Sequence, residues 1–181
     1  METHASAEET LSRWRAEEAE LRQRMLPVGV ARPEQLVGLS GIQLFEAMFD
    51  GRLPPPPIGA TLDFLPVHIA PGHAVFQGRP RPGHYNPLGT VHGGWFAALL
   101  DSALACAVHS QLPVGKSYTT LEIKMNLVRA LRDKVPLVRA EAHVVHGGKQ
   151  VATAEGRLIG PDGKLYAHAS TTCLVFDARA G

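Results

Sequence analysis

The clearest hydrophobic pattern in the chain is a run rich in Ala and Leu from Gly93 to about Gln111. It contains no proline, and no β-branched residue before Val108, so it predicts a helix of roughly five turns. Apolar residues fall on nearly every side of this helix, which indicates that other elements bury or encircle it. Pro113 and Gly115 mark its end.

The last third of the chain alternates in the way that strands do. From Leu121 to Leu127 every second residue is apolar and the residues between are polar. Three further strands are expected at 137–145, 150–159 and 165–176. Short turns between successive strands predict an antiparallel sheet. A long apolar helix before such a sheet predicts an α+β fold in which the helix lies across one sheet face.

The first 30 residues predict a charged helix with one thin apolar stripe. The stripe consists of Leu11, Trp14, Leu21 and Met25. Glu18 occupies the position that would join its two halves. We expect an arm that docks on its own domain or on a neighbouring subunit; a helix that binds another partner has less support.

A second helix is expected from Ser40, which can cap it, to about Phe49. The four prolines at 54–57 predict a stiff extended connector. Short strands at 61–69 and 73–77 and an irregular loop at 79–90 should follow. We therefore divide the chain into an N-terminal helical arm with a Pro-rich connector, residues 1–57, and a main domain, residues 58–181.

Composition narrows the class of protein. Apolar residues make up 45% of the 181 residues and charged residues 19%, so a buried core is available. The net charge of +1 provides no field to hold nucleic acid or an anionic membrane. Two cysteines exclude a disulfide scaffold, and no stretch is apolar enough for a signal peptide or a membrane span. We expect a soluble protein of a reducing, cytoplasmic compartment.

Asp101 is the one formal charge between Arg81 and Lys116, and it lies in the middle of the most apolar helix. An ionised carboxylate that leaves water without partners costs several kcal/mol. Asp101 must therefore face a cavity where chemistry occurs or bond a neighbour. Ser102 and Thr120 are the candidate structural partners.

The start of the same helix offers a second chemical feature. The first N–H groups of a helix lack internal partners, and the glycines at 93 and 94 let a ligand oxygen approach them closely. Such a site can stabilise a carbonyl oxygen that becomes negative, although the glycines could simply permit a tight turn. Gly93 and Asp101 are about 12 Å apart along a helix, too far to act on one carbonyl. In a twofold dimer, Asp101 of one chain can face Gly93 of the other.

Three segments carry a resemblance to a known family. They are Asn86-Pro87-Leu88-Gly89-Thr90-Val91-His92-Gly93-Gly94, then Asp101 nine residues after His92, and Tyr118-Thr119-Thr120-Leu121-Glu122-Ile123-Lys124-Met125-Asn126. This pattern resembles the hotdog-fold acyl-CoA thioesterases of the phenylacetate-degradation (PaaI) type over residues 58–177. The resemblance implies an antiparallel sheet wrapped around one central helix. Arg129-Ala130 departs from the Arg-Pro that is usual there, from which we expect a small loop difference.

The resemblance also implies residue roles in the hydrolysis of a medium-sized or aromatic acyl-CoA. The Gly93 N–H would polarise the thioester carbonyl, with Asn86 orienting the thioester or the water and His92 supporting the contact. Asp101 of the partner chain would act as general base or as nucleophile, and Thr120 would position the water beside it. The family uses no metal or redox cofactor, and its members form homodimers that often pair into tetramers.

Two sets of residues could complete such a site. Candidate walls of an acyl tunnel are Trp95, Phe96, Leu99 and Tyr118, although such residues are more often simply core. Candidate cations for the phosphates of CoA are Arg129, Arg132, Lys134 and Lys149, although a solvated surface is their ordinary role.

Other chemistries have weaker support. His143 and His146 should point to opposite faces of a strand, which argues against a metal site. Cys106 with His109 has the spacing of a nucleophile pair, but a free Cys in an Ala-rich helix is usually core. Two alternatives to a thioesterase remain: a hotdog enoyl-CoA hydratase or dehydratase, and a non-catalytic acyl-CoA sensor. The first would use a catalytic His, and the second would have no use for Asp101.

Overall fold

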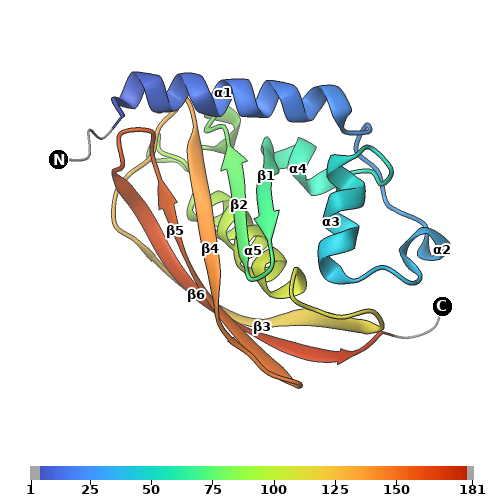
Figure 1. Ribbon diagram of the computed structural model, residues 1–181. Helices are drawn as coiled ribbons and strands as arrows, with labels where there is room; N and C mark the ends of the chain where they lie inside the picture. Colours follow the sequence, from blue (N-terminus) through green and yellow to red (C-terminus); the bar gives the residue numbers. More distant parts are fainter. Residues whose placement is uncertain (1–4, 179–181) are drawn as a thin grey trace.

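The computed structural model describes residues 5–178. In it, six strands form one antiparallel sheet that curls around a single long helix, α5 (Figure 1). The N-terminal elements are α1 (Ala7–Arg24), α2 (Pro33–Leu36), α3 (Gly41–Phe49) and α4 (Pro57–Leu62). The first strands and the helix are β1 (Phe64–Ala70), β2 (His73–Gly78), a 3₁₀ turn (Pro82–His84) and α5 (Gly93–His109). The last strands are β3 (Lys116–Leu127), β4 (Val138–Gly147), β5 (Val151–Ile159) and β6 (Leu165–Asp177). The expected α+β class is confirmed.

The strand order is β1-β2-β4-β5-β6-β3, so β1 and β3 are the two edges. Helix α5 contacts all six strands from one side, as its apolar residues predict. Leu99, Leu100 and Leu104 are fully buried against the sheet. Alanines at the facing strand positions, such as Ala142 and Ala154, leave room for the helix to approach.

One stripe of α5 remains uncovered by the sheet. Gly93, Ala97 and Asp101 follow one another at intervals of four residues and are half-buried. Residues four apart share a helix face, so these three form one line along α5. This stripe is the part of the helix that another molecule can reach.

The connector before the sheet differs from its prediction. We expected an extended connector over residues 54–57, but the extended segment ends at Pro56, because Pro57 is the first residue of α4. A proline suits the first helical position, because its missing N–H would have had no helical partner. Thr61 consequently belongs to α4, and the expected strand begins at Phe64, after Asp63 in a left-handed conformation with φ 54°.

Helix α1 runs across one end of the sheet, next to the ends of β2 and β4 (Figure 1). Trp14 is buried there, with the Arg139 guanidinium of β4 4.5 Å from its ring centroid. Glu18 accepts a hydrogen bond from Gln77 Nε2 of β2 at 2.7 Å. The arm thus docks on its own domain, one of the two placements that we expected. In the described part of the chain, no helix combines the length and apolarity needed to cross a bilayer.

Candidate active site

Asp101 lies midway along α5, on the stripe that the sheet leaves uncovered. Thr120 Oγ1 on β3 donates a hydrogen bond to Asp101 Oδ1 at 3.1 Å. Ser102, the other candidate partner, donates its hydroxyl to Ala98 O at 2.8 Å instead. Thr120 is the one hydrogen-bond partner of the Asp101 side chain within residues 5–178, so most lone pairs of this carboxylate remain available.

The groups around Asp101 are held in their neutral forms. Burial raises the pKa of the Cys106 thiol to about 12, and the negative charge of Asp101 adds to the effect. Burial also raises the pKa of the Tyr118 phenol. His109 is half-buried and packs between the rings of Phe45 and Tyr118, with ring centroids at 5.4 and 5.1 Å. A thiolate–imidazole pair of Cys106 and His109 therefore has no support.

The second feature, at the start of α5, is organised by His92. Its Nδ1 accepts from Gly94 N at 2.9 Å, and its carbonyl oxygen accepts from Trp95 N at 3.0 Å. The N–H of Gly93 finds no acceptor among residues 5–178. His84 fixes the corner, because its carbonyl accepts from His92 N at 2.8 Å and its ring stacks on Trp95. The helix thus begins with one free, half-exposed backbone donor at its positive end.

Asn86 organises the loop that leads into this corner. Its Oδ1 accepts from Leu88 N at 2.9 Å and from Thr90 N at 3.3 Å. Its Nδ2 donates to Thr90 Oγ1 at 3.0 Å. Only one Nδ2 hydrogen remains for another partner, so within this chain Asn86 acts first as the centre of a tight loop.

The structure gathers the expected site residues into two groups. Asp101 and Thr120 form one group, and His92 and Gly93 form the other, eight residues away along α5 or about 12 Å. Within residues 5–178, Asn86 makes no hydrogen bond to either group. Four surface cavities of ≈ 380 to ≈ 970 Å³ in the described part of the chain are lined by neither Gly93 nor Asp101. Within one chain, the expected site residues therefore lie in separate groups.

The candidate tunnel walls are mostly core within this chain. Trp95, Phe96 and Leu99 are each at most 3% exposed, and Trp95 Nε1 donates to Leu62 O at 2.7 Å. Tyr118 is half-buried against His109. The candidate cations for CoA are exposed. Sequence reasoning missed His84, for which only its place in the loop before the helix could have been a signal.

His143 and His146 do not lie on opposite faces of the sheet, so that prediction was wrong. In the pairing of β4 with β5, His143 lies opposite Glu155 and His146 opposite Thr153. Glu155 and Thr153 are two residues apart, so the two histidines share one face. A bulge between Val144 and His146 inserts the extra residue that simple alternation does not anticipate.

Comparison with known proteins identifies the family. Residues 88–167 match the model of the thioesterase superfamily. A phenylacetic acid degradation-related protein of Ralstonia eutropha is 30% identical, with a TM-score of 0.66; the match covers 72% of this chain and 98% of that one. A single-residue mutant of the phenylacetic acid degradation protein PaaI from Thermus thermophilus is 32% identical, with a TM-score of 0.59, covering 65% and 97%.

A more distant structure shares the fold. It is a thioesterase protein from Streptococcus pneumoniae with coenzyme A, 21% identical, with a TM-score of 0.58 and coverage of 65% of this chain and 88% of that one. No curated protein sequence matches the chain. The chain belongs to the thioesterase superfamily, with the hotdog fold and similarity to PaaI proteins. It is a thioester hydrolase.

Proposed function

We propose that the protein hydrolyses a medium-sized or aromatic acyl-CoA at sites shared between two chains. The Gly93 N–H of one chain polarises the thioester carbonyl, and Asp101 of the other activates the attacking water, with Thr120 orienting the carboxylate. Asn86 and His92 shape the loop that presents the donor. The observation that carries the proposal is the pair of incomplete half-sites on one helix, an unpaired N–H at its start and a carboxylate with one partner at its middle.

The edge strand β3 supplies a route to such a dimer. It spans 12 residues, pairs with β6 on one side only, and exposes Leu121 and Leu127. A long exposed edge with apolar side chains is a template for pairing with another strand. Twofold pairing along β3 would run the two α5 helices antiparallel, which sets Gly93 of each chain against Asp101 of the other.

The choice of acyl-CoA follows from the relatives. The similar structures include PaaI from T. thermophilus, and the pneumococcal thioesterase holds coenzyme A. An attack by water needs a general base and a carbonyl clamp, and the two half-sites provide one of each. Water then adds to the thioester carbonyl, the C–S bond breaks, and the thiol of CoA leaves with a proton.

Gly93→Pro is a sharp test of the carbonyl clamp, because it removes the N–H, although it also adds the carbons of the proline ring. His92 has φ −64° and ψ 140°, which is compatible with a following proline, and Pro is favoured at the first helical position. Gly93→Ala is the matched control, since it keeps the N–H while its Cβ meets the flexible tip of Leu127 at 3.2 Å. We expect thiol release from an acyl-CoA to fall at least about tenfold more in Gly93→Pro than in Gly93→Ala.

Complementation then tests the shared site. Chains with Asp101→Asn are mixed with Gly93→Pro chains after unfolding and refolding together, and heterodimers are confirmed by native mass spectrometry. Random pairing leaves one intact site in each heterodimer, so about a quarter of wild-type activity should return. Heterodimers without recovered activity would overturn the shared site. Loss of an enoyl absorbance without thiol release would favour a hydratase instead.

We also propose that residues 1–57 form an appendage to the catalytic domain at 58–181. The match to the R. eutropha protein covers nearly all of that chain but only 72% of this one, which leaves room for an added segment. The expected oligomer is a homodimer or a dimer of dimers, and sedimentation analysis of the full chain measures which of these forms.

A further inference from the structure

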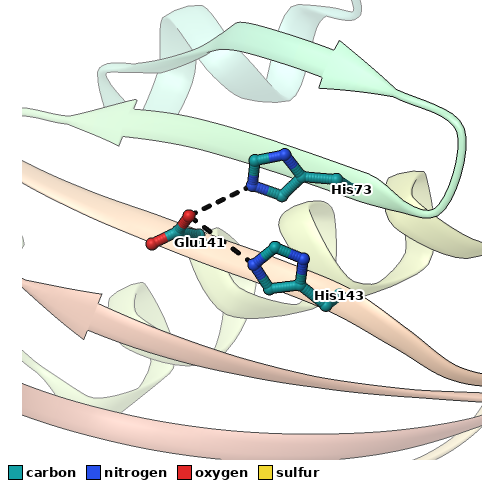
Figure 2. A group of neighbouring side chains, drawn as sticks. All are labelled: His73, Glu141 and His143. Atoms are coloured by element: carbon teal, nitrogen blue, oxygen red, sulfur yellow. Dashed lines mark hydrogen bonds and ion pairs between the residues drawn. The ribbon is translucent and has the colours of Figure 1, made fainter.

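Three side chains with metal-binding atoms converge on the outer face of the sheet, outside the proposed active site. His73 on β2 lies directly opposite His143 on β4, and Glu141 lies two residues before His143 (Figure 2). Cross-strand partners and residues two apart on one strand project to the same face. The neighbouring Ala140 and Ala142 point the other way, into the core. The pairing register therefore builds this cluster on rigid backbone.

Both imidazoles aim at one carboxylate oxygen. His73 Nε2 lies 3.2 Å from Glu141 Oε1, and His143 Nε2 lies 3.6 Å from the same atom. One ligand atom from each residue lies within 4.8 Å of the other two. Ligands of a tetrahedral Zn²⁺, at about 2.0–2.2 Å from the metal, are about 3.4 Å apart. The two rings are stacked with their centroids 4.2 Å apart, so the side chains must rotate for both Nε2 atoms to point at one ion.

We propose that His73, Glu141 and His143 bind a divalent transition-metal ion, with Zn²⁺ the favoured one. Two imidazoles and one carboxylate form a donor set suited to Zn²⁺, Co²⁺ or Ni²⁺ and poor for Mg²⁺ or Ca²⁺, which prefer oxygen ligands. Three protein ligands leave one coordination position for water.

The surroundings keep the ligands available. Arg157 lies opposite Glu141 in the register, yet no ion pair between them occurs within residues 5–178. The cluster borders a cavity of ≈ 570 Å³ lined by Glu141 and His143, so an ion can enter from solvent.

Untagged full-length protein, stripped with a chelator, is titrated with Zn²⁺ and Co²⁺ near neutral pH. Calorimetry measures affinity and stoichiometry, and the visible spectrum of Co²⁺ reports coordination geometry. We expect one ion per chain, a tetrahedral Co²⁺ spectrum, and no comparable binding of Mg²⁺. His143→Ala and Glu141→Gln should each weaken Zn²⁺ binding by at least about tenfold, a loss seen even for groups that only support metal ligands.

His168→Ala is the matched control, because His168 is another exposed histidine of the same outer face. It should bind Zn²⁺ as the wild type does. His143 is 60% exposed, so its replacement leaves the fold intact, and thermal unfolding verifies this for each variant. The proposal is overturned if wild-type protein binds no stoichiometric Zn²⁺. It is equally overturned if His143→Ala and Glu141→Gln bind as tightly as His168→Ala.

Discussion

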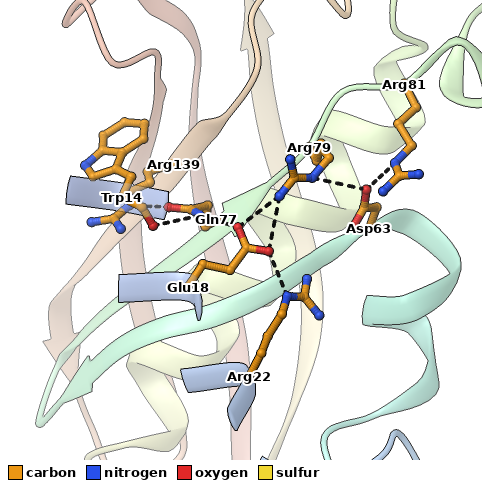
Figure 3. Close-up of polar contacts among 8 residues, drawn as sticks. All are labelled: Trp14, Glu18, Arg22, Asp63, Gln77, Arg79, Arg81 and Arg139. Carbon is orange, nitrogen blue, oxygen red and sulfur yellow. Dashed lines mark hydrogen bonds and ion pairs between the residues drawn. The ribbon is translucent and has the colours of Figure 1, made fainter. Parts of the chain in front are cut away.

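Two helices of this protein each carry a carboxylate within a stripe of otherwise apolar residues, and the two carboxylates have different hydrogen-bond partners. Glu18 on α1 is 5% exposed and accepts hydrogen bonds from Gln77 at 2.7 Å, Arg22 at 2.8 Å and Arg79 at 3.2 Å (Figure 3). Asp101 on α5 is half-buried and accepts one hydrogen bond, from the Thr120 hydroxyl.

The difference lies in what compensates each negative charge. Two guanidinium groups and an amide surround Glu18, so its lone pairs are used and it cannot take a proton from water without losing those bonds. Asp101 has one neutral partner and lies on the stripe that another chain can reach. A fully paired carboxylate holds structure together, whereas an incompletely paired one beside an open stripe is suited to chemistry.

Asp101→Asn should have the largest effect on function. The amide keeps the size of the side chain and can still bond Thr120, but it cannot accept a proton from water. We expect kcat for thiol release to fall about 10²-fold or more, the usual scale for loss of a general base, with little change in thermal stability. A variant that retains more than about a tenth of wild-type kcat would remove Asp101 from the proposed mechanism.

Glu18→Ala should instead act on stability. It leaves Gln77 and two arginines without their shared acceptor, which costs about 2 kcal/mol in the free energy of unfolding. The matched control is Glu20→Ala on the same helix, whose ion pair with Arg24 at 3.3 Å is exposed and is worth about 0.5 kcal/mol or less. Urea unfolding of both variants measures the difference. Equal losses would show that the network around Glu18 does not anchor the arm.

Acid should weaken the arm through the same residue. Burial alone would raise the pKa of Glu18, but hydrogen bonds from Arg22 and Gln77 and the charges of Arg22 and Arg79 outweigh it and lower the pKa below its usual 4.5. When folding lowers the pKa of a carboxyl group, that group stabilises the folded protein. This stabilisation is complete when the pH is above the pKa of the group in the unfolded chain, and it is lost as the pH falls through its pKa in the folded protein.

The stability of the wild type should therefore fall more steeply below about pH 4.5 than that of Glu18→Gln, which has no proton to gain. Unfolding free energies of the two proteins, measured in urea at a series of pH values, should converge on acidification. A gap that stays constant from neutral pH downward would contradict the lowered pKa of Glu18.

The sequence singled out Asp101 as a candidate site residue and missed the network of contacts around Glu18. A lone charge in an apolar helix is a local signal, so Asp101 and the buried helix around it could be recognised from residues near in the chain. Glu18 looked like a break in a stripe, because its partners Gln77 and Arg79 lie 59 and 61 residues further on. Only the folded sheet brings them under α1.

The same limit applies within the sheet. Alternation predicted the last four strands, but the bulge between Val144 and His146 changed which histidines share a face. The pairing of His73 with His143 depends on the β2–β4 register, which no short pattern reveals. Local periodicity therefore locates the elements, while contacts between distant segments decide which polar side chains meet.

Cys106→Ala should have the smallest effect, although Cys106 lies on the same helix as Asp101 and near its charge. Its pKa of about 12, raised by burial and by Asp101, leaves almost no thiolate at neutral pH, so we expect that the sulfur does not act as the nucleophile. Thiol release should change by no more than about twofold, because only packing is altered. A loss of activity as large as that of Asp101→Asn would instead identify the Cys106 thiol as the reacting group. Detection of an acyl group on Cys106 by mass spectrometry would then distinguish a covalent route from direct attack by water.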